Sequence, residues 1–245
     1  MSKTPFLLLS ATLAVAAPAH AAAPSHPDFT GLWLLESGEA RAVPKDTEAA
    51  LTPYGRAQME ARKAQIAAGF PQNELHVKCL PAGMPQMMAA PFAIQVMQAP
   101  DRIVLNAEVS NLPRTIFIGA KHPDDIDPSW NGHSVAQWQG PALAIDTVGF
   151  NDEPAFAFNF DPPVQRTEAM HVTERWTLAD GGKTLVDTMV LDDPKVFVRP
   201  VTLVYRYTRR PRDEGLMEKV CEVDRKGLEA FETAYPREPK YKHPF

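Results

Sequence analysis

The stretch DFTGLWLLE, residues 28–36, gives the clearest single indication of the fold. Phe29, Trp33 and Leu35 stand at alternate positions, so an extended chain would place all three side chains on one face. This spacing predicts a first strand over Phe29–Glu36 with one buried side. Gly31 lies two residues before Trp33.

The same alternation with period two recurs along most of the remaining chain. It predicts further strands at Ala93–Gln98, Arg102–Val109, Arg114–Gly119, Ser134–Trp138, Ala142–Val148, Glu168–Leu178, Thr184–Leu191, Val201–Thr208 and Leu216–Glu222. Residues typical of turns separate them, including Pro100-Asp101 and Asp180-Gly181-Gly182. Short strands joined by turns indicate a mainly β protein, and closure into an antiparallel up-and-down barrel would leave no exposed sheet edge.

One long helix is expected as an excursion after the first strand. Thr52 is a suitable N-cap, Pro53 fits the first helical position and Gly69 ends the helical pattern. These signals predict a helix over Pro53–Ala68. A second, short helix is expected near Arg225 to Ala234.

The Gly31-x-Trp33 pair resembles the signature at the first strand of lipocalins and other calycins. The resemblance implies a calycin-like barrel in which Trp33 plugs the closed end. It covers this short motif only. The other lipocalin motifs are missing from the sequence, and a long helix after the first strand departs from the usual lipocalin order.

A second resemblance covers most of the chain. The motifs PDFTGLW, LTPYGR, CLPAGMPQMM, DPSWNGHS, DTVGFND, VTERW and DDPKVFVRP resemble those of a family of exported bacterial proteins without an established activity. The resemblance implies export and a single β-rich domain, and it assigns no catalytic residue.

The N-terminus has the pattern of a secretory signal peptide. Lys3 precedes an apolar run that starts at Phe6 and ends in the small-x-small triplet Ala19-His20-Ala21. We expect cleavage after residue 21, leaving 22–245 as one β-barrel domain in the periplasm or outside the cell. The apolar run is shorter than the roughly 20 residues of a membrane span, so no integral membrane segment is expected after cleavage.

The net charge bears on the class of binding partner, and the cysteine content bears on disulfide formation. The formal net charge is −5, which disfavours nucleic acid as a partner. Cys79 and Cys221 are the two cysteines, and in an exported protein an even pair predicts a disulfide, with two free buried thiols as the alternative.

The segment HPDDIDPSWNGHS, residues 122–134, raises the question of function. Turn formation accounts for its Pro, Asp, Asn and Gly residues but not for its two histidines. We expect His133 to meet His171 at a barrel mouth, with Asp146 or Asp127 orienting one of them for acid–base catalysis. Tyr205 or Tyr207 would donate a hydrogen bond to a developing oxyanion.

These candidates predict a cofactor-free lyase, hydratase or isomerase acting on a hydrophobic or aromatic molecule in a barrel pocket. Arg206 or Arg175 would hold a substrate carboxylate, while Trp130 and Met88 would contact its apolar part. The alternative is a lipocalin-like carrier that binds a small hydrophobic ligand without converting it. A purely structural envelope protein is a third possibility.

Two metal hypotheses use the same segments. The histidines and aspartates of 122–134 lack the spacing of zinc or calcium sites, so no metal is expected. The soft thioethers of Met84, Met87 and Met88 suit Cu(I), but adaptable packing over a barrel mouth explains them better.

Overall fold

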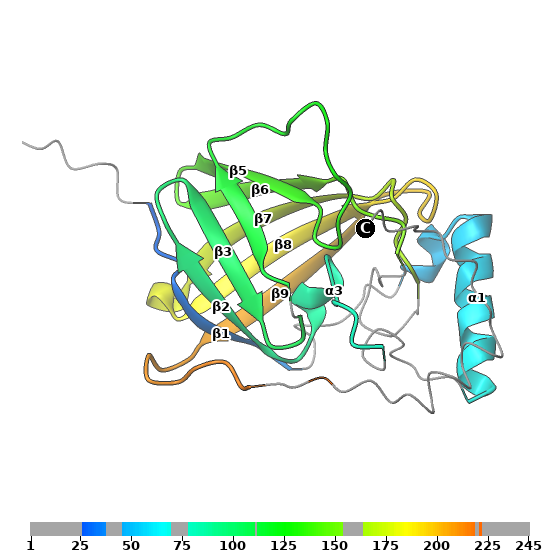
Figure 1. Ribbon diagram of the computed structural model, residues 1–245, viewed down its shortest axis with the longest axis horizontal. Coiled ribbons are helices and arrows are strands. Elements are labelled where there is room, and N and C mark those ends of the chain that lie inside the picture. Colours follow the sequence, from blue (N-terminus) through cyan, green and yellow to red (C-terminus); the bar gives the residue numbers. More distant parts are fainter. Residues whose placement is uncertain are drawn as a thin grey trace, which may run out of the picture.

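Nine strands close into one barrel in the computed structural model (Figure 1). The structure describes residues 26–37, 46–69, 78–110, 112–153, 164–218 and 221. The expected signal peptide and the expected helix near Arg225 to Ala234 lie outside these residues. The strands are β1 (Gly31–Leu35), β2 (Ala93–Gln98), β3 (Arg102–Ala107), β4 (Arg114–Ile118), β5 (His133–Gln139), β6 (Ala142–Val148), β7 (His171–Ala179), β8 (Thr184–Asp192) and β9 (Val201–Arg209).

The barrel follows chain order, and β9 pairs with β1 to close it. This confirms the expected calycin-like architecture. Every neighbouring pair is antiparallel except β4 and β5, which run parallel. The strict up-and-down expectation is therefore wrong at one position. Parallel neighbours need a long crossover, and the chain makes it through residues 119–132, the loop that rises above the barrel in Figure 1.

The predicted strand over Leu216–Glu222 is not formed in its described part, residues 216–218 and 221. Closure of β9 onto β1 explains the difference, because the sheet has no free edge left for a tenth strand to join.

The disulfide is present, with the Cα atoms of Cys79 and Cys221 5.7 Å apart. No helix among the described residues has the length and apolar character needed to cross a membrane.

Along each strand, side chains point alternately into the barrel and out to its outer wall. On β7, the inward side chains of Val172, Glu174 and Trp176 are buried, and His171 and Thr173 point outward. The inner face is mainly apolar and forms one continuous core with the loops at the barrel ends.

Trp33 lies inside the barrel, fully buried, as its place in β1 predicts. Its indole Nε1 donates to the carbonyl of Phe29 at 2.9 Å. The guanidinium of Arg209, at the end of β9, lies 4.1 Å from the centre of the indole ring. The contact joins the first and last strands where the barrel closes.

The methionine-rich segment packs into the core rather than forming an exposed flap. Met84, Met87 and Met88 have at most 1% of their surface exposed, and a short helix, α3 (Gln86–Ala89), carries two of them. The Tyr207 hydroxyl donates to the carbonyl of Met88 at 2.5 Å. This arrangement supports the packing interpretation of the methionines.

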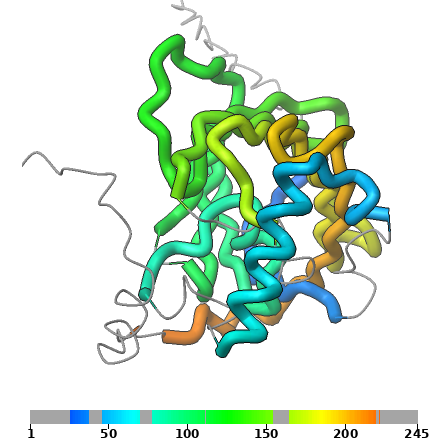
Figure 2. Tube along the Cα trace, turned by 90° about the vertical axis from the view of Figure 1, so that its right-hand side faces the viewer, coloured from blue at the N-terminus to red at the C-terminus, as the bar shows by residue number. Residues whose placement is uncertain are grey.

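The long helix α1 (Pro53–Ala67) matches the prediction closely, and the Thr52 side chain caps it by accepting from Gly55 N. The helix lies beyond one end of the barrel, as the two views together show (Figures 1 and 2). It is attached there to the β8–β9 connection, because Thr52 N donates to Val196 O at 2.9 Å.

Candidate functional site

Three neighbouring strands and one loop bring four titratable side chains together. His133 begins β5, Asp146 lies in β6 and His171 begins β7. His122 comes from the crossover loop, which folds back over these strands. We call these four residues the histidine cluster.

The histidine cluster is joined by a continuous series of hydrogen bonds. His133 Nδ1 lies 2.8 Å from His122 Nδ1, and His122 Nε2 lies 3.3 Å from Asp146 Oδ2. The second carboxylate oxygen, Oδ1, contacts His171 Nε2. His133 and His171 are thus connected as expected, and Asp146 rather than Asp127 is the orienting carboxylate. His122 is the member that links them.

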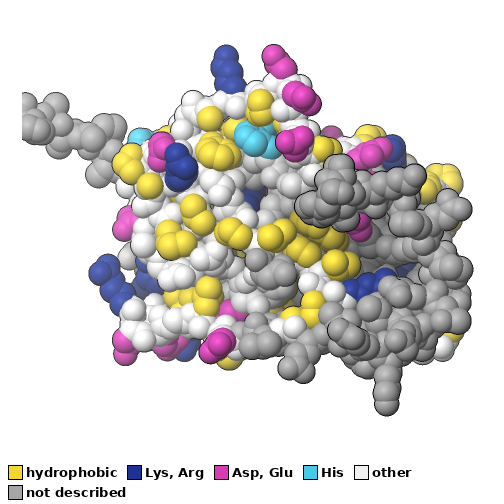
Figure 3. Space-filling model, in the orientation of Figure 1, with side chains coloured by type: hydrophobic (Ala, Val, Ile, Leu, Met, Phe, Trp, Pro, Cys, Tyr) yellow, Lys and Arg dark blue, Asp and Glu magenta, His cyan; other side chains and the backbone are white. Residues whose placement is uncertain are grey.

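The cluster lies on the outer wall of the barrel, not in its interior. The chain neighbours Ser134 and Thr147 are buried and bond to each other inside, so His133 and Asp146 must point the other way. The expectation of a site that opens into the barrel is therefore wrong. Asp146 and His171 keep 43% and 44% of their side-chain surface exposed, so both are accessible from solvent. Figure 3 shows histidine side chains at this surface, near hydrophobic and acidic ones.

The crossover loop is held to the wall by a close contact at its far end. Gly149 follows β6 with φ +74°, and a Cβ atom there would lie 2.4 Å from Ile126 Cγ2. Ser129 N also donates to Gly149 O at 3.1 Å. The glycine lets Ile126 approach the backbone, and this fixes the part of the loop that follows His122.

An aromatic side chain orients one end of the cluster. The Phe117 ring stacks on His133, with 5.3 Å between ring centres and an 18° angle between planes. Burial, together with the nearby His122, lowers the pKa of His133 below its usual 6.5. His133 is therefore neutral at pH 7 and can act as a base or as a hydrogen-bond donor.

The carboxylate determines which ring nitrogens carry protons when the three imidazoles are neutral. Asp146 accepts from Nε2–H of both His122 and His171. His122 Nδ1 then accepts from Nδ1–H of His133. This assignment leaves two unprotonated nitrogens, His133 Nε2 and His171 Nδ1, and neither has a hydrogen-bond partner among the described residues. The two ends of the series can therefore each take up a proton.

Five predicted site residues lie away from the cluster. Tyr205 is buried inside the barrel. Arg175 projects outward and donates to Gln139 at 3.0 Å. Arg206 is also outside, 3.4 Å from Asp180 and 3.6 Å from Glu36.

The two predicted apolar contacts are likewise placed elsewhere. Met88 is buried in α3, and Trp130 is half-buried. The Trp130 carbonyl accepts from Met84 N at 3.1 Å, so this residue anchors the methionine segment.

A second polar network, which the sequence did not lead us to expect, fills part of the interior. Arg114 is 1% exposed and forms a two-pronged ion pair with Glu174, with Nη1 3.0 Å from Oε1. Its remaining N–H groups donate to Ser134 and Thr147, for example at 3.1 Å to each from Nη2. Trp176 Nε1 donates to Glu174 Oε1 at 3.3 Å. Each of the three guanidinium nitrogens therefore has at least one acceptor within the protein.

Asp187 adjoins this network and is fully buried. Burial, with the neighbouring Glu174 carboxylate, raises its pKa well above the usual range. The buried environment therefore favours the neutral, protonated form of Asp187. Neither of its oxygens has a donor among the described residues.

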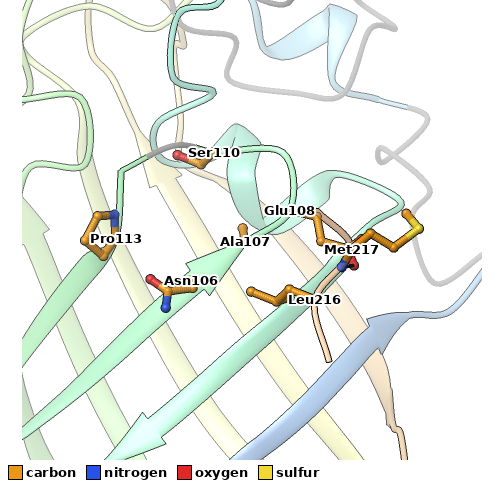
Figure 4. A pocket seen from close by; sticks show the side chains of 7 residues that line it. All are labelled: Asn106, Ala107, Glu108, Ser110, Pro113, Leu216 and Met217. Carbon is orange, nitrogen blue, oxygen red and sulfur yellow. Dashed lines mark hydrogen bonds between the residues drawn. The ribbon is translucent and has the colours of Figure 1, made fainter. Parts of the chain in front are cut away.

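A groove of about 220 Å³ lies elsewhere, between the end of β3 and residues 216–217 (Figure 4). It is lined by Asn106, Ala107, Glu108, Ser110, Pro113, Leu216 and Met217, none of which is a predicted site residue. Among the described residues, no group of three or more His, Cys, Asp or Glu side chains is arranged to hold a metal ion.

No protein-family model matches the chain, and no curated protein does. Two solved structures of the REP1-NXSQ fatty acid transporter are similar to it at 14% identity, and each covers 74% of this chain. A mutant form is matched over 97% of its length with a TM-score of 0.33, and the transporter itself over 96% with 0.32. These values show neither a family nor a function for the chain.

Proposed function

We propose that the protein is an enzyme that moves protons on a small molecule bound at the histidine cluster. The observation that carries this proposal is the hydrogen-bond series from His133 through His122 and Asp146 to His171. If these four side chains only stabilised the fold, hydrogen bonds from each of them to backbone groups or to water would be enough. A series with a basic nitrogen at each end is instead suited to general acid–base catalysis.

Each end of the series would act on the substrate by itself, because the N–H groups within the series all point towards Asp146. If His171 Nδ1 removes a proton from a substrate carbon, Asp146 stabilises the imidazolium that forms. The protonated His171 Nδ1 can then return this proton to a different atom of the substrate or to its leaving group. His133 Nε2 can accept and return a proton in the same way at the other end of the series. Removal at one position and delivery at another is the chemistry of a lyase, hydratase or isomerase.

The surface beside the cluster favours a hydrophobic or aromatic substrate. Phe117 is half-buried and presents a ring next to His133. Val135 and Val148 are the outward residues of β5 and β6 around Asp146, and together with Phe117 they form an apolar floor. A flat apolar molecule could stack there with its reactive atoms near the histidines. No step of this proposal requires a cofactor.

A panel of aromatic metabolites, incubated with the protein and followed by mass spectrometry, tests the proposal. Once a product is found, Asp146→Asn should lower kcat/KM by about 100-fold or more, because general acid–base catalysis typically contributes that much. Asp125→Asn is the matched control, since it makes the same change at an exposed aspartate of the crossover loop. Equal turnover by both variants would exclude the cluster as the catalytic site.

A second candidate function is a carrier that binds a small hydrophobic ligand inside the barrel without converting it. The specific observation in its favour is Asp187, a fully buried acid without a hydrogen-bond partner among the described residues. A carrier should bind its ligand equally well with Asp146 intact or replaced, because the interior and the outer wall are separated by the sheet.

We also infer that the protein works in the periplasm or outside the cell. The disulfide between Cys79 and Cys221 supports this location, because such bonds persist in oxidising compartments. Cleavage mapping by N-terminal sequencing of the exported protein would test the expected processing after residue 21.

A further inference from the structure

We propose that the barrel interior contains a binding site for the neutral polar head of a small apolar molecule, anchored by Asp187 and Tyr205. This site rests on the second candidate function, and it is independent of the histidine cluster. Asp187 and Tyr205 are direct cross-strand partners on β8 and β9, and both side chains point into the barrel. Trp176, the partner of Asp187 on β7, completes this row.

The anchor is unusual because the Asp187 carboxyl group is buried without a hydrogen-bond partner among the described residues. Asp187 is 0% exposed, and Tyr205, its partner on β9, is 4% exposed. Leaving a polar group buried and unpaired destabilises the folded state, so such groups normally have a bound partner.

The charge balance of the interior determines what kind of head group fits. Arg114 is the cation of this region, and it is already occupied by Glu174, Ser134 and Thr147. Glu174 balances its charge, and burial favours the protonated form of Asp187, which carries none. A carboxylate ligand would therefore bring an uncompensated negative charge next to Glu174. A hydroxyl or carbonyl group, by contrast, can bond to the two O–H groups at no such cost.

The walls around the anchor suit an apolar body. Trp33 and Trp176 are fully buried, and Met189 and Leu203 belong to the next inward row on β8 and β9. Met88 of α3 is attached to Tyr207, two residues beyond Tyr205. Methionine side chains repack easily around ligands of different shape.

A matched pair of probes tests the head-group class: decan-1-ol and decanoate, which share an apolar chain and differ in charge at pH 7.5. Binding is followed by the fluorescence of the protein, since Trp33 and Trp176 lie in the interior, and by calorimetry. We expect decan-1-ol to bind at least about tenfold more tightly than decanoate. Tyr205→Phe should weaken decan-1-ol binding by about three- to tenfold, the value of one hydrogen bond.

Val204→Ala is the control, because Val204 is adjacent in β9 but 48% exposed on the outer wall. Asp146→Asn should also bind decan-1-ol as the unmodified protein does. Equal or tighter binding of decanoate would overturn the neutral-head proposal while leaving a carrier function in place. Absence of saturable binding of both probes would overturn the interior site and the carrier function together. Unchanged decan-1-ol affinity in Tyr205→Phe would remove the proposed anchor.

Discussion

Adjacent residues on β5 and β6 belong to two separate polar networks. His133 and Asp146 lie in the outer network, whereas their chain neighbours Ser134 and Thr147 bond to Arg114 inside. The alternation of side chains across a strand produces this separation. The outer network is open to solvent and has unprotonated nitrogens at its ends. The inner network is buried, and its Arg114–Glu174 pair is charge-balanced; the adjoining Asp187 differs in having no hydrogen-bond partner among the described residues.

The lowered pKa of His133 can be measured directly. In an NMR titration of the ring protons, His133 should titrate below 6.5, because its partly buried ring loses hydration when charged and because His122 lies beside it. Replacement of His122 by Gln should raise the His133 pKa slightly, because it removes the effect of His122 and leaves the larger effect of burial in place. A His133 that titrates at or above 6.5 would contradict the placement of its ring beneath the crossover loop.

Asp187 predicts a dependence of stability on pH. Its raised pKa means that the folded protein keeps a proton that the unfolded chain loses above pH about 4. The free energy of unfolding should therefore fall as the pH rises from about 4 towards the folded-state pKa, by up to about 1.4 kcal/mol per pH unit. Asp187→Asn, which has no proton to lose, should show a flatter profile between pH 4.5 and 7.5.

Denaturant unfolding at several pH values measures this difference. Asp192→Asn is the control, because it removes an exposed aspartate from the same strand. Identical slopes for the Asp187 variant and the unmodified protein would show that Asp187 is ionised in the folded state.

Several of these residues were predictable from the sequence, and others were not. Glu174 shares a face with Val172 and Trp176, so alternation alone indicates a buried charge that needs a partner. Arg114 stands on the same face as Ile116, which is a comparable signal. His122 could not be placed, because its position depends on how the crossover loop folds over strands distant in sequence.

At the scale of elements, the crossover loop completes the histidine cluster, because it brings His122 against His133 and Asp146 of the strands. Periodicity predicted all nine strands within about three residues of both ends, and β2 and β6 from the first residue to the last. It predicted neither the parallel pairing of β4 with β5 nor the failure of the 216–222 strand. Both depend on which strands become neighbours, and alternation within one segment carries no information about neighbours.

Gly149→Ala should detach the crossover loop from the wall. The added methyl group would overlap Ile126, so the loop must move and His122 should lose its contact with Asp146. Gly140→Ala is a matched control: its φ of +62° is similarly unfavourable for alanine, but nothing lies within 4 Å of the added atom. Both variants should lose about 1–2 kcal/mol of stability from backbone strain.

Only Gly149→Ala should also shift the His122 ring resonances and, once a substrate is known, reduce turnover. Equal effects of the two substitutions would show that the contact with Ile126 does not hold the loop.

At the scale of the whole molecule, closure of the barrel stabilises the folded state, whereas the disulfide mainly restricts the conformations of the unfolded chain. Closure is enforced by the β1–β9 pairing and by the Arg209–Trp33 contact. The disulfide joins Cys79, just before the methionine segment, to Cys221, beyond the last strand, across 142 positions of sequence. Its effect should therefore fall on the unfolded chain, where it removes the freedom of a loop that contains most of the barrel.

Cys79→Ser/Cys221→Ser should lower the free energy of unfolding by about 5 kcal/mol in the chain-entropy limit and leave the barrel folded. The strand pairings do not involve either cysteine, so the far-ultraviolet circular dichroism should keep its β-sheet form. Denaturant unfolding of the variant measures the loss, and the unmodified protein in excess reductant should give the same midpoint. If reduction or substitution instead abolishes the barrel, the disulfide would be required to hold the methionine segment in the core, and the stabilisation would lie in the folded state.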